Sequence, residues 1–215
     1  GMHGSVASNM ACDNCDLLIA VGCRFSDRVA LKPETFAHQA KIVHIDIDRA
    51  EINKNVQTDH HIIGDAKQVL NLLLERLPQY EHKEWKDFVL SFPRETEYGE
   101  SESVLTPKQV LSAIARKCPQ DSIVATDVGQ HQMWAIQHLH FDYPGQLLTS
   151  GGFGTMGFGL GAAIGAAVGT GERSVLVTGD GSFGMCLNEL TTAVTYNVPV
   201  VILLMNNGVL GMVRQ

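Results

Sequence analysis

The sequence predicts an α/β protein made of two doubly wound domains, each built on a parallel sheet and each incomplete. Short apolar runs alternate with segments of helical periodicity, as in parallel sheets joined by crossover helices. The apolar runs end in glycine and polar residues, which is typical of strands whose carboxyl ends face a ligand. A polar stretch separates the two sets of elements. We therefore expect domains at residues 1–77 and 107–215, joined by a linker at residues 78–106.

The composition fits a globular chain with a substantial core and disfavours several classes of partner. The 215 residues are 45% hydrophobic, with a formal net charge of −7. An acidic chain without lysine or arginine clusters is unsuited to nucleic acid or to anionic membranes. Five cysteines at irregular spacing favour a reducing compartment, and no secretory signal is visible, so we expect a cytoplasmic protein. The apolar segment 156–168 is shorter than the roughly 20 residues that a membrane span requires.

The first domain is expected to contain three strands, at residues 17–21, 41–47 and 60–63. They end at Gly22, Asp46 and Gly64 or within a residue of them, and glycine after a buried strand suits the approach of a ligand. Asp65 is placed to cap a helix with one apolar face at residues 66–77. From spacing alone, Asp46 and Asp65 are best interpreted as a solvated strand end and a helix cap.

The linker and the start of the second domain also follow from local patterns. Trp85 and Phe88 indicate a short amphipathic helix within the linker. Thr106 and Pro107 are a cap and a first helical residue, so a helix is expected at residues 107–118. A strand at 122–126 and a helix through residue 139 follow.

Nine glycines between residues 151 and 171 could indicate a flexible linker. Their spacing argues against it. Gly157, Gly161, Gly165 and Gly169 recur every fourth residue among apolar side chains. We therefore predict a helix whose glycine stripe allows close packing against another backbone.

The last part of the sequence predicts a metal and diphosphate site. A buried strand leads into Gly179-Asp180-Gly181, and after a helix a second strand, at residues 200–205, ends at Asn206 and Asn207. A right-handed crossover brings Asp180 and Asn207 to one sheet edge. Carboxylate, amide and carbonyl oxygens are the ligands that Mg²⁺ prefers, and Gly181 would let a diphosphate approach the backbone. Either turn alone is an ordinary loop, but a hairpin is excluded because a helix follows Gly181.

These motifs resemble those of the acetolactate synthase (acetohydroxyacid synthase) family of thiamine diphosphate enzymes. The resemblance rests on Gly179-Asp180-Gly181 with Asn207, and on the motif at residues 210–215. It implies that Mg²⁺ is held by Asp180, the Asn207 side chain and the Val209 carbonyl. The same likeness places Gly179, Gly181 and Ser182 at the diphosphate.

Other motifs resemble the family in the same chain order, at residues 1–4, 16–25, 44–52, 128–135 and 154–156. They imply that thiamine diphosphate also contacts Gln130, His131, Gly154 and Met156, with Met156 supporting the bent form of the cofactor. The middle domain would bind a structural FAD through Gly22, Arg24, Asp46, Ile47, Asp65 and Ala66. Arg28 and Met212 would face the substrate. The chain departs from the family pattern at Ser26, which is usually aspartate, and at Gly161, which is commonly proline.

The resemblance implies an enzyme that joins two pyruvates, or pyruvate and 2-oxobutyrate, with release of CO₂ in branched-chain amino acid biosynthesis. The enzyme would be a homo-oligomer with a possible regulatory subunit. Residues 1–77 would be the end of its middle domain and residues 107–215 a truncated cofactor-binding domain. Because the pyrimidine-binding domain with its activating glutamate is missing, we expect the chain alone to be inactive. Two alternatives stay open: a fragment of another thiamine diphosphate enzyme, such as a pyruvate oxidase or carboligase, or a non-catalytic nucleotide-binding or subunit-interaction module.

Overall fold

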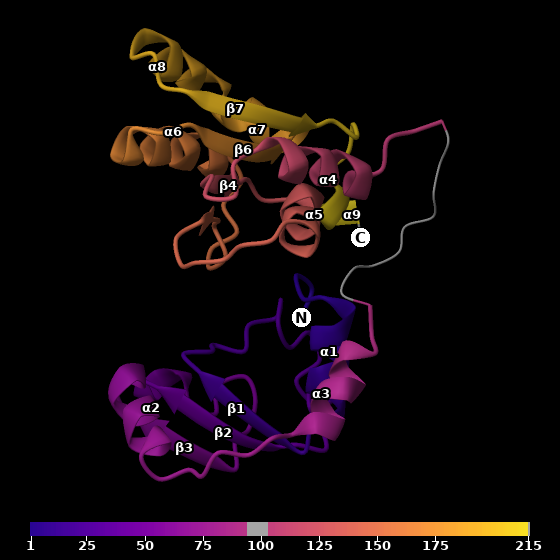
Figure 1. Cartoon of the computed structure of the whole chain (residues 1–215), viewed down its shortest axis with the longest axis vertical. Helices are drawn as coiled ribbons and strands as arrows, with labels where there is room; N and C mark the ends of the chain where they lie inside the picture. Colours follow the sequence, from indigo (N-terminus) through magenta and orange to yellow (C-terminus); the bar gives the residue numbers. More distant parts are fainter. Residues whose placement is uncertain (94–102, 215) are drawn as a thin grey trace. The chain divides into compact units, whose positions relative to one another are not determined.

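The computed structural model describes residues 1–93 and 103–214 (Figure 1). The chain divides into two compact units, Gly1–Thr96 and Glu97–Gln215, and the division lies within the predicted linker. Residues 94–102 of that linker, and Gln215 at the end of the last family motif, lie outside the described residues. Each unit is described below by itself.

Unit 1 contains a three-stranded sheet in the order β1-β2-β3, in which both strand pairs are parallel. Its strands are β1 (Leu17–Val21), β2 (Lys41–Asp46) and β3 (His60–Ile63). Its helices are α1 (Val6–Asn14), the short 3₁₀ helix η1 (Arg49–Glu51), α2 (Ala66–Leu74) and α3 (Lys83–Leu90). The parallel pairing confirms the predicted fold class for this unit.

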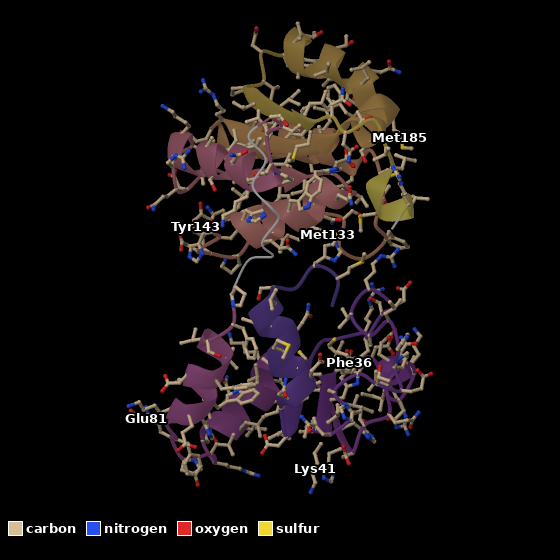
Figure 2. The ribbon with its side chains drawn as sticks, turned by 90° about the vertical axis from the view of Figure 1, so that its right-hand side faces the viewer. Phe36, Lys41, Glu81, Met133, Tyr143 and Met185 are labelled. Carbon is tan, nitrogen blue, oxygen red and sulfur yellow. The ribbon has the colours of Figure 1, made fainter. Side chains whose placement is uncertain are left out.

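The core of unit 1 lies on one face of the sheet, beneath the loop that follows β1. Ala20 and Ile42 from the strands pack with Phe25 and Ala30 of that loop. Phe36, labelled in Figure 2, meets the Phe25 ring edge-on with centroids 5.8 Å apart. The opposite face is partly open, because Leu17 is about half exposed. The loop is therefore an integral part of the core.

Helix α2 is shorter than predicted. It ends at Leu74, three residues before the expected end at residue 77. Pro78 follows, and a proline disfavours helical geometry at the residue before it. None of the residues of α2 is buried in this unit.

Unit 2 contains a four-stranded sheet in the order β5-β4-β6-β7, again with every pair parallel. Its strands are β4 (Val124–Thr126), β5 (Leu147–Leu148), β6 (Ser174–Gly179) and β7 (Val200–Met205). Its helices are α4 (Pro107–Lys117), α5 (Gln130–His138), α6 (Phe158–Thr170), α7 (Asp180–Cys186), η2 (Leu187–Glu189), α8 (Leu190–Thr195) and α9 (Gly211–Arg214).

Helices cover both faces of this sheet. On one face Leu111 of α4 and Ala135 of α5 pack against Val175 and Val177. On the other face Leu160 of α6 and residues of α7 and α8 pack against Leu176. Figure 1 shows β6 between β4 and β7, within these layers. The sheet is therefore doubly wound, as predicted.

Most elements of unit 2 were predicted, and three differ. The helix after β6 begins at Asp180 itself and is broken into α7, η2 and α8, whereas one continuous helix after Gly181 was expected. Strand β4 begins at Val124, because the residues before it form a turn in which the Ser122 amide donates to the Pro119 carbonyl. The two-residue strand β5 was not predicted, since so short a segment has no periodicity.

The glycine-rich segment forms helix α6, which confirms a helix and not a flexible linker. Along the predicted stripe only Gly157 lies against another segment, with Met185 Cβ 3.5 Å from a Cβ placed there. A Cβ at Gly161, Gly165 or Gly169 would meet nothing within 4 Å among the described residues. The closely packed glycine is Gly159 on another face. A Cβ there would lie 2.8 Å from both the Asp127 amide nitrogen and Leu176 Cδ1.

These two environments give a matched pair of substitutions in α6. Gly159→Ala should destabilise unit 2 by about 1–3 kcal/mol, because a rigid backbone must shift to admit the methyl group. Gly161→Ala should stabilise it by about 0.5–1 kcal/mol, since alanine is the better helix former and the site is open. Urea unfolding of the two variants measures both effects. A loss of stability in both, or in neither, would contradict the assignment of Gly159 as the closely packed position.

Candidate functional site

The carboxyl ends of β4, β6 and β7 meet at one edge of the unit 2 sheet, and the predicted diphosphate and metal residues follow these ends. Gln130 and His131 begin α5, and Asp180 begins α7. Asn207 follows β7. A hydrogen bond joins two of these segments across the edge, since Asn207 Nδ2 donates to Gln130 Oε1 at 3.3 Å. Residues 77 positions apart are thus brought together. The predicted crossover from Asp180 to Asn207 is a separate feature, and the parallel pairing of β6 with β7 agrees with it.

The proposed metal ligands have different surroundings. Asp180 is half-buried and makes no hydrogen bond or ion pair with the described residues. Asn207 is exposed, and its Oδ1 accepts from the Val209 amide at 3.1 Å. Since an amide oxygen has two lone pairs, Asn207 keeps one for a ligand. In the described ranges no group of three or more His, Cys, Asp or Glu residues is arranged so that it could hold a metal ion, and the predicted set contains a single carboxylate.

Glycines make this edge compact because their neighbours occupy the space of a side chain. A Cβ on Gly179 would lie 2.8 Å from His131 Nδ1. A Cβ on Gly181 would collide with the Leu210 side chain and would lie 3.8 Å from Met156 Cε. Leu210 thus occupies the side-chain direction of Gly181, and the approach of a diphosphate to the Gly181 backbone stays a prediction. Packing against the Leu210 side chain explains why residue 181 is a glycine.

His131 is a buried base at this edge. Its Nε2 has no hydrogen-bond partner among the described residues. Burial lowers the pKa of His131 below its ordinary value, and the nearby Asp127 and Asp180 charges only partly offset this effect. The ring is therefore mainly neutral near pH 7 in the folded chain. A buried ring nitrogen without a partner is unusual in a folded protein and marks a candidate contact for a ligand.

Ser182 ties the first turn of α7 to the segment that follows β4. Its side chain is buried, and its Oγ donates to the Val128 carbonyl at 2.8 Å. The hydroxyl group thus contributes to the packing of the site, and contact of Ser182 with a diphosphate stays a prediction.

The predicted aminopyrimidine loop is held closed by its own residues. The Gly154 amide donates to the Ser150 carbonyl at 3.0 Å, and the Thr155 amide donates to Ser150 Oγ at 3.1 Å. Gly154 has a φ of +65°, a conformation that favours glycine. Met156 is half-buried and reaches toward Gly181. The structure therefore brings Met156 to the same edge as Asp180. Met185, labelled in Figure 2, extends from α7 and is largely exposed.

One further residue belongs to this site and was missed as a functional residue. Asp127 follows β4 directly and is fully buried. Its Oδ1 accepts from the Gly157 amide at 2.8 Å, which anchors the end of the aminopyrimidine loop. Its place after a buried strand was visible in the sequence, but its partner, 30 residues away, was not.

In unit 1 the predicted FAD residues also gather at the carboxyl edge of the sheet. They follow β1 (Gly22 and Arg24), end or follow β2 (Asp46 and Ile47), and follow β3 (Asp65 and Ala66). Gly22 has a φ of +61°, and Ile47 is largely exposed. Asp46 Oδ1 accepts from the Asp48 amide at 2.9 Å, and Asp65 Oδ1 caps α2 through the Gln68 amide at 3.0 Å. The capping role expected for Asp65 is thus confirmed, whereas the solvated strand end expected for Asp46 is wrong, because Asp46 is buried and holds the backbone turn after β2. A ligand role of either acid stays a prediction.

The two predicted substrate residues lie in different units. Arg28 is in the loop after β1 and pairs with the adjacent Asp27 at 2.9 Å. Met212 is half-buried in α9. Each is described only within its own unit.

Two further sequence interpretations concern thiols and membranes. All five cysteines are free, and burial raises the pKa of Cys12 and Cys15, which disfavours reactive thiolates. In the ranges that the structure describes, no helix is long and apolar enough to cross a bilayer.

Comparison with known proteins agrees with this architecture. Residues 1–73 match the central domain of thiamine pyrophosphate enzymes, and residues 127–215 match their C-terminal domain, which binds thiamine pyrophosphate, another name for thiamine diphosphate. The chain therefore belongs to the thiamine diphosphate-dependent enzymes.

Within this family the chain is similar over its whole length to acetolactate synthase large subunits. It is 44% identical to that of Corynebacterium glutamicum and 44% identical to that of isozyme 2 from Escherichia coli K12. It is 46% identical to the probable large subunit of Methanocaldococcus jannaschii. The chain spans 36%, 39% and 38% of these three relatives, in that order.

The lowered pKa of His131 predicts a pH dependence of stability. Because the folded-state pKa lies below the unfolded value, the unfolded chain binds the proton more readily. The free energy of unfolding is therefore highest above the ordinary pKa of 6.5 and falls as the pH drops through the folded-state pKa. In His131→Gln this part of the pH dependence should be absent.

The free energy of unfolding in urea is measured at about pH 7.5 and about pH 5.5. The difference between these two values reports the titration of His131. Trp134 fluorescence reports on unit 2 once the other tryptophan is replaced by Trp85→Phe. The exposed His60 of unit 1 provides the control His60→Gln, which should leave the pH dependence of unit 2 unchanged. If the free energy of unfolding changes with pH equally in the His131→Gln variant and its parent, His131 does not cause the pH dependence.

Proposed function

We propose that this chain forms part of an acetolactate synthase large subunit and supplies the diphosphate and Mg²⁺ side of its thiamine diphosphate site. The observation that carries the proposal is the sheet edge of unit 2, where Asp180 and Asn207 lie beside Gln130 and His131. The family membership and the similarity to acetolactate synthase large subunits along the whole chain support it. The reaction joins two 2-oxo acids, pyruvate with pyruvate or with 2-oxobutyrate, and releases CO₂.

The residues present fit Mg²⁺ and a diphosphate. Asp180 offers a carboxylate without a partner among the described residues, and Asn207 and Val209 offer an amide and a carbonyl oxygen, the hard donors that Mg²⁺ prefers. The orphaned Nε2 of buried His131 is a polar atom that a ligand at this edge would satisfy. Gln130 adds an amide within the same hydrogen-bonded group.

The resemblance to the family supports the following roles for these residues. Thiamine diphosphate, when bound, supplies the electron sink for decarboxylation of a 2-oxo acid. Asp180, Asn207 and the Val209 carbonyl hold the metal, and Gln130 and His131 contact the diphosphate. Gly179, Gly181 and Ser182 offer the backbone of the first turn of α7. Gly154 and Met156 orient the aminopyrimidine, while Met212 and Arg28 face the substrate.

Unit 1 is proposed to bind FAD in a structural role. Its three parallel strands direct Gly22, Asp46 and Asp65 to one edge, and the exposed Ile47 adds apolar surface for a planar ring. Ala66 lies at the start of α2, where unpaired amides favour a phosphate. Arg24 supplies a positive charge beside Gly22. The match of residues 1–73 to the central domain of the family supports this assignment.

The whole enzyme is proposed to act as a homo-oligomer with a possible regulatory subunit. Large apolar side chains are exposed in unit 2 beside the proposed cofactor edge: Phe153 is 95% exposed and Val213 80% exposed. Such exposure of large apolar groups is typical of an interaction surface.

Metal binding tests the proposed site directly. The wild-type chain should bind thiamine diphosphate in the presence of Mg²⁺, and Asp180→Asn should weaken this binding at least about tenfold, because ligation of the metal by a charged group is lost. Isothermal titration calorimetry measures both. Asp121→Asn is the matched control, since Asp121 is exposed before β4, away from the edge that holds Asp180.

Equal affinities of Asp180→Asn and the wild type would refute Asp180 as a metal ligand. Strong binding of thiamine diphosphate without any divalent cation would refute the metal site as a whole. Binding by neither chain would favour the alternative of a subunit-interaction module.

Activity is proposed for the whole enzyme only. The 215 residues span little more than a third of the acetolactate synthase large subunits they resemble. We therefore predict that the purified chain forms no acetolactate from pyruvate, with Mg²⁺, thiamine diphosphate and FAD supplied. A colorimetric acetolactate assay checks this, with an intact acetolactate synthase as positive control. Turnover above the cofactor-only background would overturn the prediction.

A further inference from the structure

The carboxyl group of Asp127 contacts two segments that belong to different halves of the proposed cofactor site. Its Oδ1 accepts from the Gly157 amide at 2.8 Å, at the end of the loop that carries Gly154 and Met156. Its Oδ2 lies 3.5 Å from Thr178 Oγ1, two residues before Asp180. These partners are 30 and 51 positions away along the chain. One side chain therefore lies between the aminopyrimidine loop and the metal-binding turn.

We propose that Asp127 is a positioning residue that fixes the aminopyrimidine loop relative to the metal-binding turn. The inference rests on the proposed function, which gives these two segments their roles. Asp127 does not contact the cofactor, since it is fully buried beneath the sheet edge. It acts through the Met156–Gly157 peptide and through Thr178.

The surroundings of Asp127 hold its carboxyl group in one orientation. The Val128 amide donates to the same Oδ1 at 2.9 Å, and the Asp127 amide donates to the Val177 carbonyl of β6 at 3.0 Å. Gly159 packs directly against the Asp127 backbone and excludes other arrangements of α6. Thr178 is also fully buried. A buried group with these fixed partners cannot change rotamer without leaving polar atoms unsatisfied.

The bond to Gly157 matters because it determines the plane of one peptide. Gly157 has a φ of +88°, and its amide belongs to the peptide that begins at the Met156 carbonyl. Fixing that amide fixes the direction in which Met156 leaves the loop. The bonds to Ser150 hold the other end of the same loop. Without Asp127 the loop would be held at one end only.

The first test needs no cofactor. Amide hydrogen exchange at Gly157, followed by NMR on the whole chain, should accelerate at least about tenfold in Asp127→Ala, because the buried acceptor is lost. Asp127→Asn keeps an oxygen at the same place and should retain most of the protection. The control is Ser174→Ala, which removes a buried bond between β6 and α6 at the opposite edge, from Ser174 Oγ to the Ala163 carbonyl at 2.7 Å.

Equal protection of Gly157 in Asp127→Ala and Ser174→Ala would overturn the proposal. If Asp127→Ala does not fold, amide exchange in the wild-type chain tests the proposal instead. Gly157 should then exchange much more slowly than the exposed Gly152, and equally fast exchange at the two amides would overturn the proposal.

The second test compares two probes, Mg²⁺ with thiamine diphosphate and Mg²⁺ with inorganic diphosphate, which lacks the aminopyrimidine. In Asp127→Ala the affinity for thiamine diphosphate should fall about tenfold, and that for diphosphate no more than about threefold, since a misplaced loop affects only the larger ligand. Equal losses for both probes would overturn the positioning role. If the wild type binds neither probe, the proposed cofactor site of this chain fails, while the exchange experiment still decides the role of Asp127.

Discussion

Strand β6 is buried at all six of its residues and pairs in parallel with β4 on one side and β7 on the other. Burying Val175, Leu176 and Val177 contributes about 1.5–3 kcal/mol each, so the middle of the strand has little tolerance for polar groups. Polar chemistry is confined to the strand ends, where loops leave the sheet. Because all the strands are parallel, their carboxyl ends lie at one edge, and Asp127, Asp180 and Asn207 meet there. Because both faces of the sheet are covered, polar residues lie at the strand ends, and the site forms there.

Unit 1 uses the same arrangement with a different degree of burial. Its sheet has a packed face beneath the loop after β1, while the other face keeps Leu17 about half exposed. Asp65 caps α2 and also stands at the edge proposed for FAD. A helix cap and a ligand contact are compatible at one residue, because a carboxylate has several acceptor positions. The structural interpretation of such an acid therefore does not compete with the functional one.

The sequence was most informative where the pattern repeats along the chain. Three predictions depend on local periodicity or on parallel-sheet topology, and the structure has all three: the apolar run of β6, the capping pair Thr106-Pro107, and the parallel crossover from β6 to β7 that carries Asp180 and Asn207. Periodicity could not identify the packed glycine of α6. Glycine spacing marks a stripe, whereas contact depends on which face meets Asp127, and that face carries Gly159.

The site was less predictable than the fold for a related physical reason. His131 and Met156 have no local pattern that distinguishes a ligand contact from a core residue, and only family resemblance singled them out. Asp127 was overlooked because its partners, Gly157 and Thr178, are distant in sequence. Leu210 above Gly181 was likewise unpredictable, since it depends on the path of the loop after β7.

The loop after β7 also determines how the amide of Gln130, a residue outside the loop, is oriented. The Val209 amide fixes which end of the Asn207 amide is oxygen, and the nitrogen end then donates to Gln130 Oε1. Because Gln130 Oε1 accepts this bond, the Gln130 amide nitrogen is the end that would donate to the diphosphate proposed at this edge. The direction of one backbone N–H would in this way determine which atom of Gln130, 77 residues before Asn207, meets the ligand.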